Sequence, residues 1–314
     1  MSRPSTPEHH QTRWGLFQIC LAGVLWGTGG LGVQLIRRHE PMSVVTISAW
    51  RMLLAAVVLV AAVLLLRQAG SVRALLRAHP WRAVAVGTGT ALYQACYFGS
   101  VVAIGVTVST VVSLGLAPVL LTVLDALRSR RRPASGRLLV LAAALAGLLL
   151  VSLTSGSGTT GPHPTLGVLL ALGSGTAYAV ATDLGRPLAQ VAGPLALTTT
   201  TTTVGTLVLL PLGVVASLGS DRLVTTEPAA VVGLVYLGVM TMALAYGLLY
   251  AGLRTTTGSS ATIATLLEPV TAAVAAGLIL DERLGLLGVV GTLLILAAVA
   301  GLGGEEEPVS VPPP

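Results

Sequence analysis

Apolar stretches separated by short polar loops run along almost the whole chain. A helix that crosses a bilayer needs about 20 mostly apolar residues, and by this measure the sequence predicts ten membrane spans, five in each half. We therefore expect an all-α integral membrane protein with ten transmembrane helices. The expected spans are residues 14–36, 42–66, 83–102, 106–127, 138–154, 165–182, 194–217, 229–250, 258–280 and 284–303.

The two halves repeat each other with a shift of 151 positions, which aligns Pro118 with Pro269. Both prolines lie inside expected spans, where we predict helix kinks. The segment after the first of these spans, 128–131, is rich in arginine, whereas an acidic pair follows the second at 281–282. Because each half holds an odd number of spans, the second copy enters the membrane the other way up. Inverted repeats of this kind are typical of secondary transporters.

The repeat divides the chain into two five-helix units and three connecting or terminal segments. The linker between the units, SGSGTTGPHP, is uncharged and flexible, and the two tails are polar or proline-rich, so we expect the tails to be disordered. The predicted segments are a cytoplasmic N-terminal tail at 1–13, the first repeat at 14–154, an outer linker at 155–164, the second repeat at 165–303 and a cytoplasmic C-terminal tail at 304–314.

The distribution of arginine predicts the orientation. With the N-terminus in the cytoplasm, thirteen of the eighteen basic residues fall in inner segments and four in outer ones. Inner loops of membrane proteins are enriched in basic residues, although Arg37 and Arg38 form an outer pair against this trend. We therefore predict a multi-pass protein of the cell inner (cytoplasmic) membrane with both termini in the cytoplasm.

Composition excludes several classes of protein. The chain is 54% hydrophobic and 10% charged, whereas soluble domains carry about 25% charged residues. The net charge of +6 does not point to nucleic acid, because the arginines lie in short loops between spans. Cys20 and Cys96 fall inside spans and form no disulfide framework. The sequence holds no P-loop, metal-binding cluster or catalytic motif, so we expect no cofactor, no metal and no enzymatic activity.

Several motifs resemble those of a known family. They are LLEPVTAAVAAGLILDERLGLLGVVG at 266–291, LAGVLWGTGG at 21–30, the arginine of AWRMLLAA at 49–56, and Ala-Pro-Val at 117–119. Over roughly 14–303 the chain resembles the EamA-type ten-helix transporters of the drug/metabolite transporter superfamily. The resemblance implies an exporter or exchanger of small metabolites, with helices 1, 3, 4, 6, 8 and 9 around a central cavity and helices 5 and 10 at the periphery. One departure is Arg131-Arg132, where the family usually carries Glu-Arg.

Glu268 is the most informative single residue. It lies near the middle of span nine, where a charge costs roughly 2.5–3.5 kcal/mol on insertion scales. Pro269 has no N–H, so we expect it to free the carbonyl of Thr265. A carboxyl group beside an unpaired carbonyl predicts a site for an ammonium group or a proton, with Glu268 as the coupling residue. The alternative is that Glu268 only hydrogen-bonds a neighbouring helix.

Aromatic residues recur at helical spacing on the spans expected to line the cavity. Tyr93 and Tyr97 lie four residues apart on span three, as Tyr246 and Tyr250 do on span eight. A tyrosine at mid-membrane needs a partner for its hydroxyl, and a wet cavity supplies one. Ordinary packing is the alternative. The predicted substrate-binding residues are Trp26, Tyr93, Gln94, Tyr97, Tyr178, Tyr246, Tyr250 and Glu268.

Three other charged residues lie within or at the ends of spans. Arg51 either anchors a substrate carboxylate or, as we favour, pairs with an acidic side chain or with helix-end carbonyls. Asp125 and Asp183 lie near inner helix ends, where they are interfacial charges or partners in an inner gate.

These observations favour a secondary transporter that moves an amino acid or related compound out across the membrane by alternating access. With no ATP-binding motif, the energy would come from proton coupling or exchange. The alternative cargo is a drug, a nucleoside or another amphipathic organic cation. A non-transporting membrane sensor and an intramembrane enzyme are remote alternatives. The expected partners are a small-molecule substrate and the lipid bilayer, with the protein a monomer or a homodimer.

Overall fold

The computed structural model describes residues 7–104, 106–154, 164–218, 222–279 and 285–305. Every regular element in these ranges is helical, which confirms the all-α fold class. The helices are α1 (Pro7–His39), α2 (Val44–Leu65), α3 (Ala69–Ala78), α4 (Pro80–Ile104), α5 (Val106–Ser129), α6 (Ser135–Thr154), α7 (Pro164–Val191), α8 (Pro194–Ser217), α9 (Pro228–Tyr236), the π-helical segment η1 (Leu237–Leu244), α10 (Ala245–Gly252), α11 (Gly258–Ala264), α12 (Leu267–Ile279) and α13 (Leu286–Glu305).

The ten expected spans all coincide with helical segments. Seven of the described helices are long and apolar enough to cross a membrane, and Leu286–Leu302 in α13 is a shorter apolar helix. Span eight is one continuous rod built from α9, η1 and α10, while span nine is divided between α11 and α12. The count of ten crossings therefore remains a prediction, because α4, the divided span and α13 do not meet the criteria of length and apolarity within the described residues.

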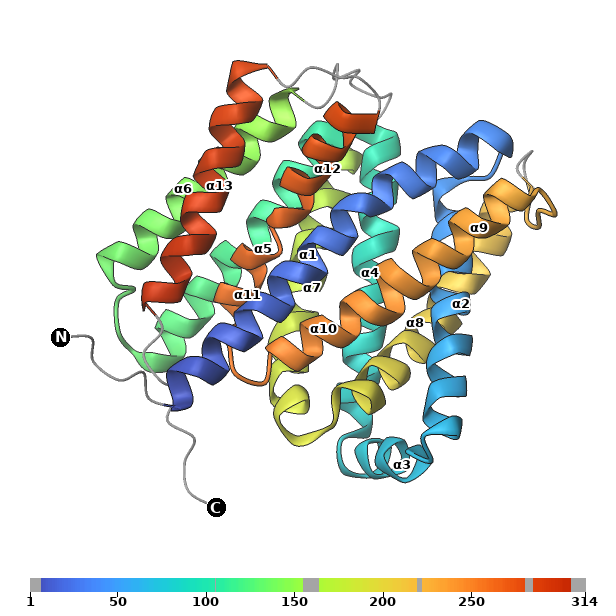
Figure 1. Cartoon of the computed structure of the whole chain (residues 1–314), viewed down its shortest axis with the longest axis horizontal. Coiled ribbons are helices and arrows are strands. Elements are labelled where there is room, and N and C mark those ends of the chain that lie inside the picture. Colours follow the sequence, from blue (N-terminus) through green and yellow to red (C-terminus); the bar gives the residue numbers. More distant parts are fainter. Residues whose placement is uncertain (1–6, 105, 155–163, 219–221, 280–284, 306–314) are drawn as a thin grey trace.

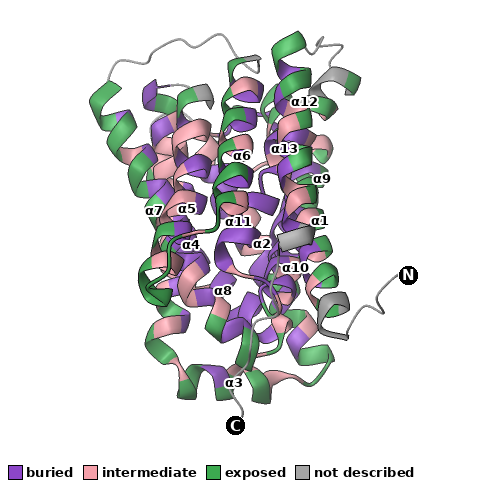
Figure 2. Cartoon of the chain, turned by 90° about the vertical axis from the view of Figure 1, so that its left-hand side faces the viewer, coloured by how far each residue is buried: buried purple, intermediate pink, exposed green. Residues whose placement is uncertain are grey.

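A short helix that we did not expect, α3, lies in the arginine-rich loop after α2, across one end of the bundle (Figures 1 and 2). Leu75 is buried, and the helix contacts α8 and α4. Arg73 and Arg77 are exposed. The helix is too short to count as a span, and its apolar face is narrow, which is why the apolar pattern did not reveal it.

The packing follows the internal repeat. Helix α4 of the first half packs along α7 of the second half. The equivalent segment of the second half, α9 to α10, packs along α1 of the first half. The equivalent helices α6 and α13 pack against each other at one edge of the molecule (Figure 1), the peripheral position that the family resemblance implies. Their backbones touch, because a Cβ on Gly147 would lie 2.6 Å from the carbonyl oxygen of Gly291.

Contacts at the helix ends show the relative directions of the repeat-related helices α1 and α7. Thr255 Oγ1 donates to the carbonyl of Gln11 near the start of α1, at 3.2 Å. Arg186 Nε, near the end of α7, donates at 2.8 Å to the carbonyl of Thr256, the residue that follows Thr255. The start of α1 and the end of α7 therefore lie at the same end of the molecule, which is the relation that an inverted repeat requires.

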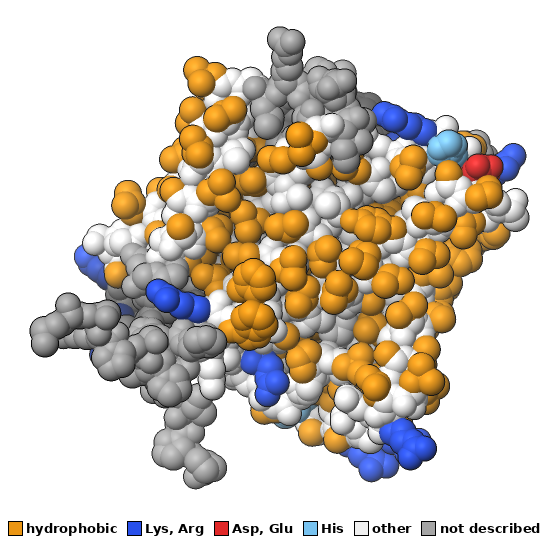
Figure 3. Space-filling view, in the orientation of Figure 1, with side chains coloured by type: hydrophobic (Ala, Val, Ile, Leu, Met, Phe, Trp, Pro, Cys, Tyr) orange, Lys and Arg blue, Asp and Glu red, His pale blue; other side chains and the backbone are white. Residues whose placement is uncertain are grey.

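The surface is apolar around the middle and charged towards the ends. In Figure 3 hydrophobic side chains cover the central band of the visible face, whereas arginines gather at its edges. Large aliphatic side chains remain highly exposed, including Leu65 at 82% and Leu278 at 80%. A water-soluble monomer does not present so extensive an apolar surface, whereas lipid accommodates it.

Candidate substrate-binding cavity

Glu268 lies directly after a break in its helix. α11 ends at Ala264 and α12 begins at Leu267, with Thr265 in the turn between them. The backbone N–H of Glu268 donates to the carbonyl of Thr265 at 2.9 Å. The expectation that Pro269 leaves this carbonyl free is therefore wrong, because a tighter turn supplies a donor one residue earlier than the missing proline N–H. The break itself is the feature that the proline led us to expect as a kink.

Two glycines of α1 allow that helix to touch the backbone at the break. A Cβ on Gly27 would lie 2.5 Å from the carbonyl oxygen of Glu268, and one on Gly23 would lie 3.3 Å from that of Thr265. Real Cβ atoms do not approach a carbonyl oxygen as closely as the first of these distances, so α1 could not pack here with a larger residue at Gly27. The same helix carries Trp26, which this contact holds beside Glu268.

The carboxyl group lines a cavity of about 50 Å³ near the centre of the bundle. A pocket that takes up a small organic ligand usually measures about 300–1,000 Å³, so this cavity has room for water but must widen to admit a metabolite. Its lining consists of one residue from each of six membrane-embedded segments: Trp26, Arg51, Tyr93, Tyr178, Tyr246 and Glu268. Five of the six are residues that the sequence predicted for the substrate site.

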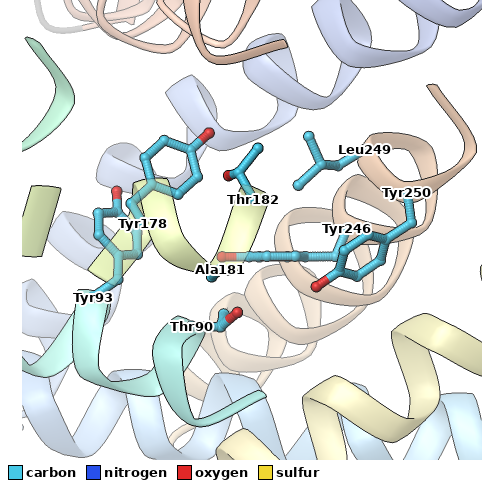
Figure 4. A pocket seen from close by; sticks show the side chains of 8 residues that line it. All are labelled: Thr90, Tyr93, Tyr178, Ala181, Thr182, Tyr246, Leu249 and Tyr250. Atoms are coloured by element: carbon cyan, nitrogen blue, oxygen red, sulfur yellow. The ribbon is translucent and has the colours of Figure 1, made fainter. Parts of the chain in front are cut away.

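The three tyrosines of this lining separate the cavity from a smaller neighbouring cavity. Tyr93, Tyr178 and Tyr246 also line a space of about 10 Å³, together with Thr90 and Tyr250 (Figure 4). In Figure 4 Tyr93 and Tyr178 lie on one side and Tyr246 and Tyr250 on the other. A rearrangement of these rings would join the two spaces into one larger pocket.

The aromatic rings contact one another in two groups. Trp26 meets Tyr246 edge to face with ring centroids 5.1 Å apart, and Tyr246 lies 6.2 Å from Tyr250. Tyr93 stacks on Tyr178 at 5.0 Å. Spacing and geometry of this kind are favourable for aromatic pairs. The cavity is therefore enclosed by two small aromatic groups rather than by isolated rings.

Of the predicted residues, Tyr250 lines only the smaller cavity, and two others lie outside both cavities. Tyr97 stacks on Tyr93 at 6.3 Å, but its hydroxyl pairs with Thr110 Oγ1 at 2.9 Å, and neither cavity includes it in its lining. Gln94 is only 2% exposed, and it contacts the cavity residue Arg51 instead. Both residues support lining side chains, so a role in binding for either remains a prediction.

Hydrogen bonds fix the orientation of two lining side chains. Trp26 Nε1 donates to the carbonyl of Thr241 at 2.8 Å, and Thr241 lies in the π-helical segment η1. π-helical turns occur often at functional sites. The hydroxyl of Tyr178 pairs with Thr265 Oγ1 at 3.0 Å, so the break in span nine is tied directly to α7.

Arg51 is the lining residue whose direct partner we did not expect. Its Nη2 donates to Gln94 Oε1, while its buried Nε finds no acceptor in the described part of the chain. Arg51 and Glu268 line the same cavity, yet the ion pairs found between described residues do not include either of them. The direct hydrogen-bond partner is thus an amide, while the acidic side chain of Glu268 faces the same cavity without a direct bond to Arg51 within the described residues. The second span also contributes to the cavity, which the family resemblance did not imply.

Polar contacts join the two repeats at the end of the bundle that we expect to face the cytoplasm. Arg128 on α5 makes a two-pronged ion pair with Asp183 on α7, with distances of 2.5 and 2.9 Å. Ser259 at the start of α11 donates to Asp125 at 2.8 Å and also accepts from Arg137 of α6. Asp125 and Asp183 therefore lie in contacts that would have to open for an inner gate.

A second set of contacts joins the repeats at the opposite end. Arg222 forms an ion pair with Glu40 at 3.3 Å, and Thr225 donates to the same carboxylate at 3.0 Å. Trp50 Nε1 donates to the carbonyl of Leu223 at 2.6 Å. The central cavity is therefore flanked by cross-repeat contacts on both sides.

Comparison with known proteins agrees with this architecture. The model of the EamA-like transporter family matches the chain twice, over residues 13–153 and 165–304. The chain is 26% identical over 267 residues to the uncharacterized transporter YwfM of Bacillus subtilis (strain 168), a match that covers 85% of this chain and 86% of that protein. A crystal structure that is 18% identical aligns with a TM-score of 0.75 over 91% of this chain and 95% of the other, and it supports the fold alone.

The two family matches correspond closely to the two repeats deduced from the sequence, and together they cover nearly all of the described helices. The chain therefore belongs to the EamA-like transporter family and is a multi-pass membrane transporter.

Proposed function

We propose that the protein exports a small metabolite with an amino group, an amino acid or a related compound, across the cytoplasmic membrane by alternating access. The observation that carries this proposal is the position of Glu268, which lines a central aromatic cavity directly after a helix break. Broken helices at the interface between repeats form the substrate and ion sites of many secondary transporters. In the orientation that the arginine distribution predicts, both termini lie in the cytoplasm.

The chemistry of the lining favours a cationic group on the cargo. The face of an aromatic ring attracts a cation, most strongly when the surroundings exclude water. Tyr178 and Tyr246 are each 7% exposed, so they provide such surroundings beside the carboxylate of Glu268. An ammonium group bound here would compensate the charge of the carboxylate.

The same carboxyl group would couple export of the cargo to movement of a proton. It can hold a proton or an ammonium group, but not both at once, so arrival of the cargo displaces the proton. After the cargo has left on the far side, a proton must bind before the unpaired carboxylate can return through the low-dielectric interior. Export of one cargo molecule would then accompany entry of a proton.

Alternating access follows from the contacts at the two ends. Opening towards the cytoplasm separates Arg128 from Asp183, and opening to the other side separates Arg222 from Glu40. Each contact joins the two repeats, so a rocking motion of one repeat against the other breaks one set while the other set remains closed.

A second candidate cargo is an amphipathic organic cation such as a drug or a nucleoside-like compound. The aromatic lining favours this candidate, because stacking against tyrosine and tryptophan suits flat, hydrophobic cations. The two candidates share the site at Glu268 and differ in whether the cargo also carries a negative group.

Transport by proteoliposomes tests the proposal. Vesicles loaded with a mixture of amino acids and organic amines should take up labelled members of the same set by exchange, and Glu268→Gln should reduce this exchange at least a hundredfold. Glu227→Gln is the matched control, because Glu227 precedes α9 outside the cavity, and it should exchange like the wild type. Unchanged exchange by Glu268→Gln would leave the residue a packing acid and contradict the proposal.

A further inference from the structure

Arg51 is a permanent positive charge inside the bundle. A guanidinium group stays protonated in proteins and offers five N–H donors. Burying a charge is costly unless it is paired and hydrogen-bonded. An arginine at this depth in α2 therefore requires acceptors, and the acceptors present show what else the cavity is built to bind.

The protein supplies only part of what this guanidinium needs. Gln94, on α4, accepts one hydrogen bond through its side-chain oxygen. Gln94 is 2% exposed, and its Nε2 and the Nε of Arg51 are both buried without an acceptor among the described residues. An amide holds the guanidinium in place but contributes no negative charge, so Gln94 orients Arg51 without neutralising it.

The opposite charge lies in the same cavity. Arg51 and Glu268 both line the space of about 50 Å³, and Trp26, Tyr93, Tyr178 and Tyr246 complete its lining. Since the two charged residues do not form an ion pair with each other within the described ranges, each remains available to a bound molecule. A simple organic cation would pair with Glu268 and leave a second, uncompensated positive charge at Arg51.

We propose that Arg51, oriented by Gln94, binds a carboxylate of the cargo, and that the cargo is therefore a zwitterion with an ammonium and a carboxylate group, as in an α-amino acid. This inference rests on the proposed function and narrows its cargo class. The carboxylate accepts from the planar guanidinium, a geometry in which two parallel N–H···O bonds form. The ammonium group faces Glu268 and the aromatic rings, so both charges of the site are compensated together.

Matched ligands test this directly. The affinities of the purified wild-type protein in nanodiscs should be measured by calorimetry for a panel of amino acids, for the amines that lack the carboxylate, and for the corresponding amino-acid amides. At least one amino acid should bind at least tenfold more tightly than its own amine and its own amide. Arg51→Lys, which keeps the charge but loses the planar fork, should weaken the amino acid at least tenfold and leave the amine within twofold.

Two further variants control for folding and for general loss of charge. Arg222→Lys changes an arginine of the outer ion pair and should preserve the preference for the amino acid. Gln94→Glu places a carboxylate beside Arg51, so it satisfies the guanidinium internally. It should fold like the wild type, lose the preference for the amino acid at least tenfold, and bind the amine at least as tightly as the wild type does.

Three results would overturn the inference while the proposed function stands: amines that bind as tightly as their amino acids, an equal loss of both ligands in Arg51→Lys, or a preference that survives in Gln94→Glu. If no amino acid and no amine binds, and proteoliposomes exchange none of them, then the proposed function fails as well.

Discussion

The helices that contain Pro118 and Pro269 are related by the internal repeat, yet they fold differently. α5 continues through Pro118 from Val106 to Ser129, whereas the second helix is divided into α11 and α12 just before Pro269. A proline removes one hydrogen bond in either position. Proline alone therefore does not explain why only the second helix is broken.

Close packing is also common to both copies. Gly23 on α1 contacts the backbone of α11 near the break, and Gly175 on α7 contacts α5, where a Cβ would lie 2.7 Å from the carbonyl oxygen of Ser113. The difference lies in the polar residues. Thr265 donates its hydroxyl to the carbonyl of Thr262 at 2.9 Å, and threonine bonding of this type bends helices. The first copy has Leu114 at the equivalent position.

The residue before the proline is also apolar in the first copy and polar in the second. Ala117 is completely buried in the first copy, while Glu268 lines the cavity in the second. The comparison indicates that the proline-containing helix of the first repeat lines neither cavity, whereas that of the second contributes Glu268. The proposed coupling therefore rests on a carboxyl group that only one of the two repeats carries at this position.

The largest effect is expected in a labelling experiment that tests the opposite directions of the two helices. After replacement of the native cysteines by serine, Ser129→Cys at the end of α5 and Arg254→Cys just before α11 should both react with an impermeant thiol reagent from the cytoplasmic side only. Thr226→Cys, before α9, should react only from outside. Labelling of Ser129→Cys and Arg254→Cys from different sides would contradict the inverted repeat.

A smaller but substantial effect is expected where α1 meets the break. Gly27→Val places side-chain atoms against Glu268 and Thr271, and overpacking of this kind costs about 1–3 kcal/mol. The melting temperature in detergent should fall clearly. Gly30→Ala is the control on the same helix, because a Cβ there would meet nothing within 4 Å. Equal melting temperatures for the two variants would mean that α1 does not touch the break.

Removal of single hydroxyl groups should sharpen the comparison further. Thr265→Val loses the bond to Tyr178 at the break together with the bond to the carbonyl of Thr262, and Thr110→Val loses a comparable bond to Tyr97 outside the cavity. Each bond between helices should contribute about 0.6 kcal/mol, the average for polar contacts between membrane helices. Stability should therefore fall at least as much in Thr265→Val as in Thr110→Val, whereas the exchange rate should fall about tenfold in Thr265→Val alone. A matching loss of exchange in Thr110→Val would place function outside the break.

The smallest effect is expected at Tyr97. Because this residue stacks on Tyr93 without lining either cavity, Tyr97→Phe should change the exchange rate less than threefold. Tyr246→Phe, which alters a ring shared by both cavities, should change it more. The opposite order, measured in the same vesicles at equal protein density, would exclude Tyr246 from the cargo path.

The sequence predicted the helices and much of the cavity because both leave periodic signals. Apolar stretches of sufficient length mark spans, and tyrosines four residues apart mark one face of a helix. The partner of Arg51 left no such signal, since Gln94 is 43 positions away and on another helix. The true donor to the Thr265 carbonyl was also hidden, because it depends on a tight turn. Short helix α3 escaped detection since it buries little apolar surface.

The central claim is that the carboxyl group of Glu268 exchanges a proton for the cargo. The most direct measurement is proton release when the tightest-binding amino acid of the panel is added to purified protein in weakly buffered solution near neutral pH, followed with an indicator dye. The wild type should release protons in proportion to the amino acid bound, and Glu268→Gln, tested at ligand concentrations that restore binding, should release none. Equal release by the two proteins, or binding without release in the wild type, would contradict the claim.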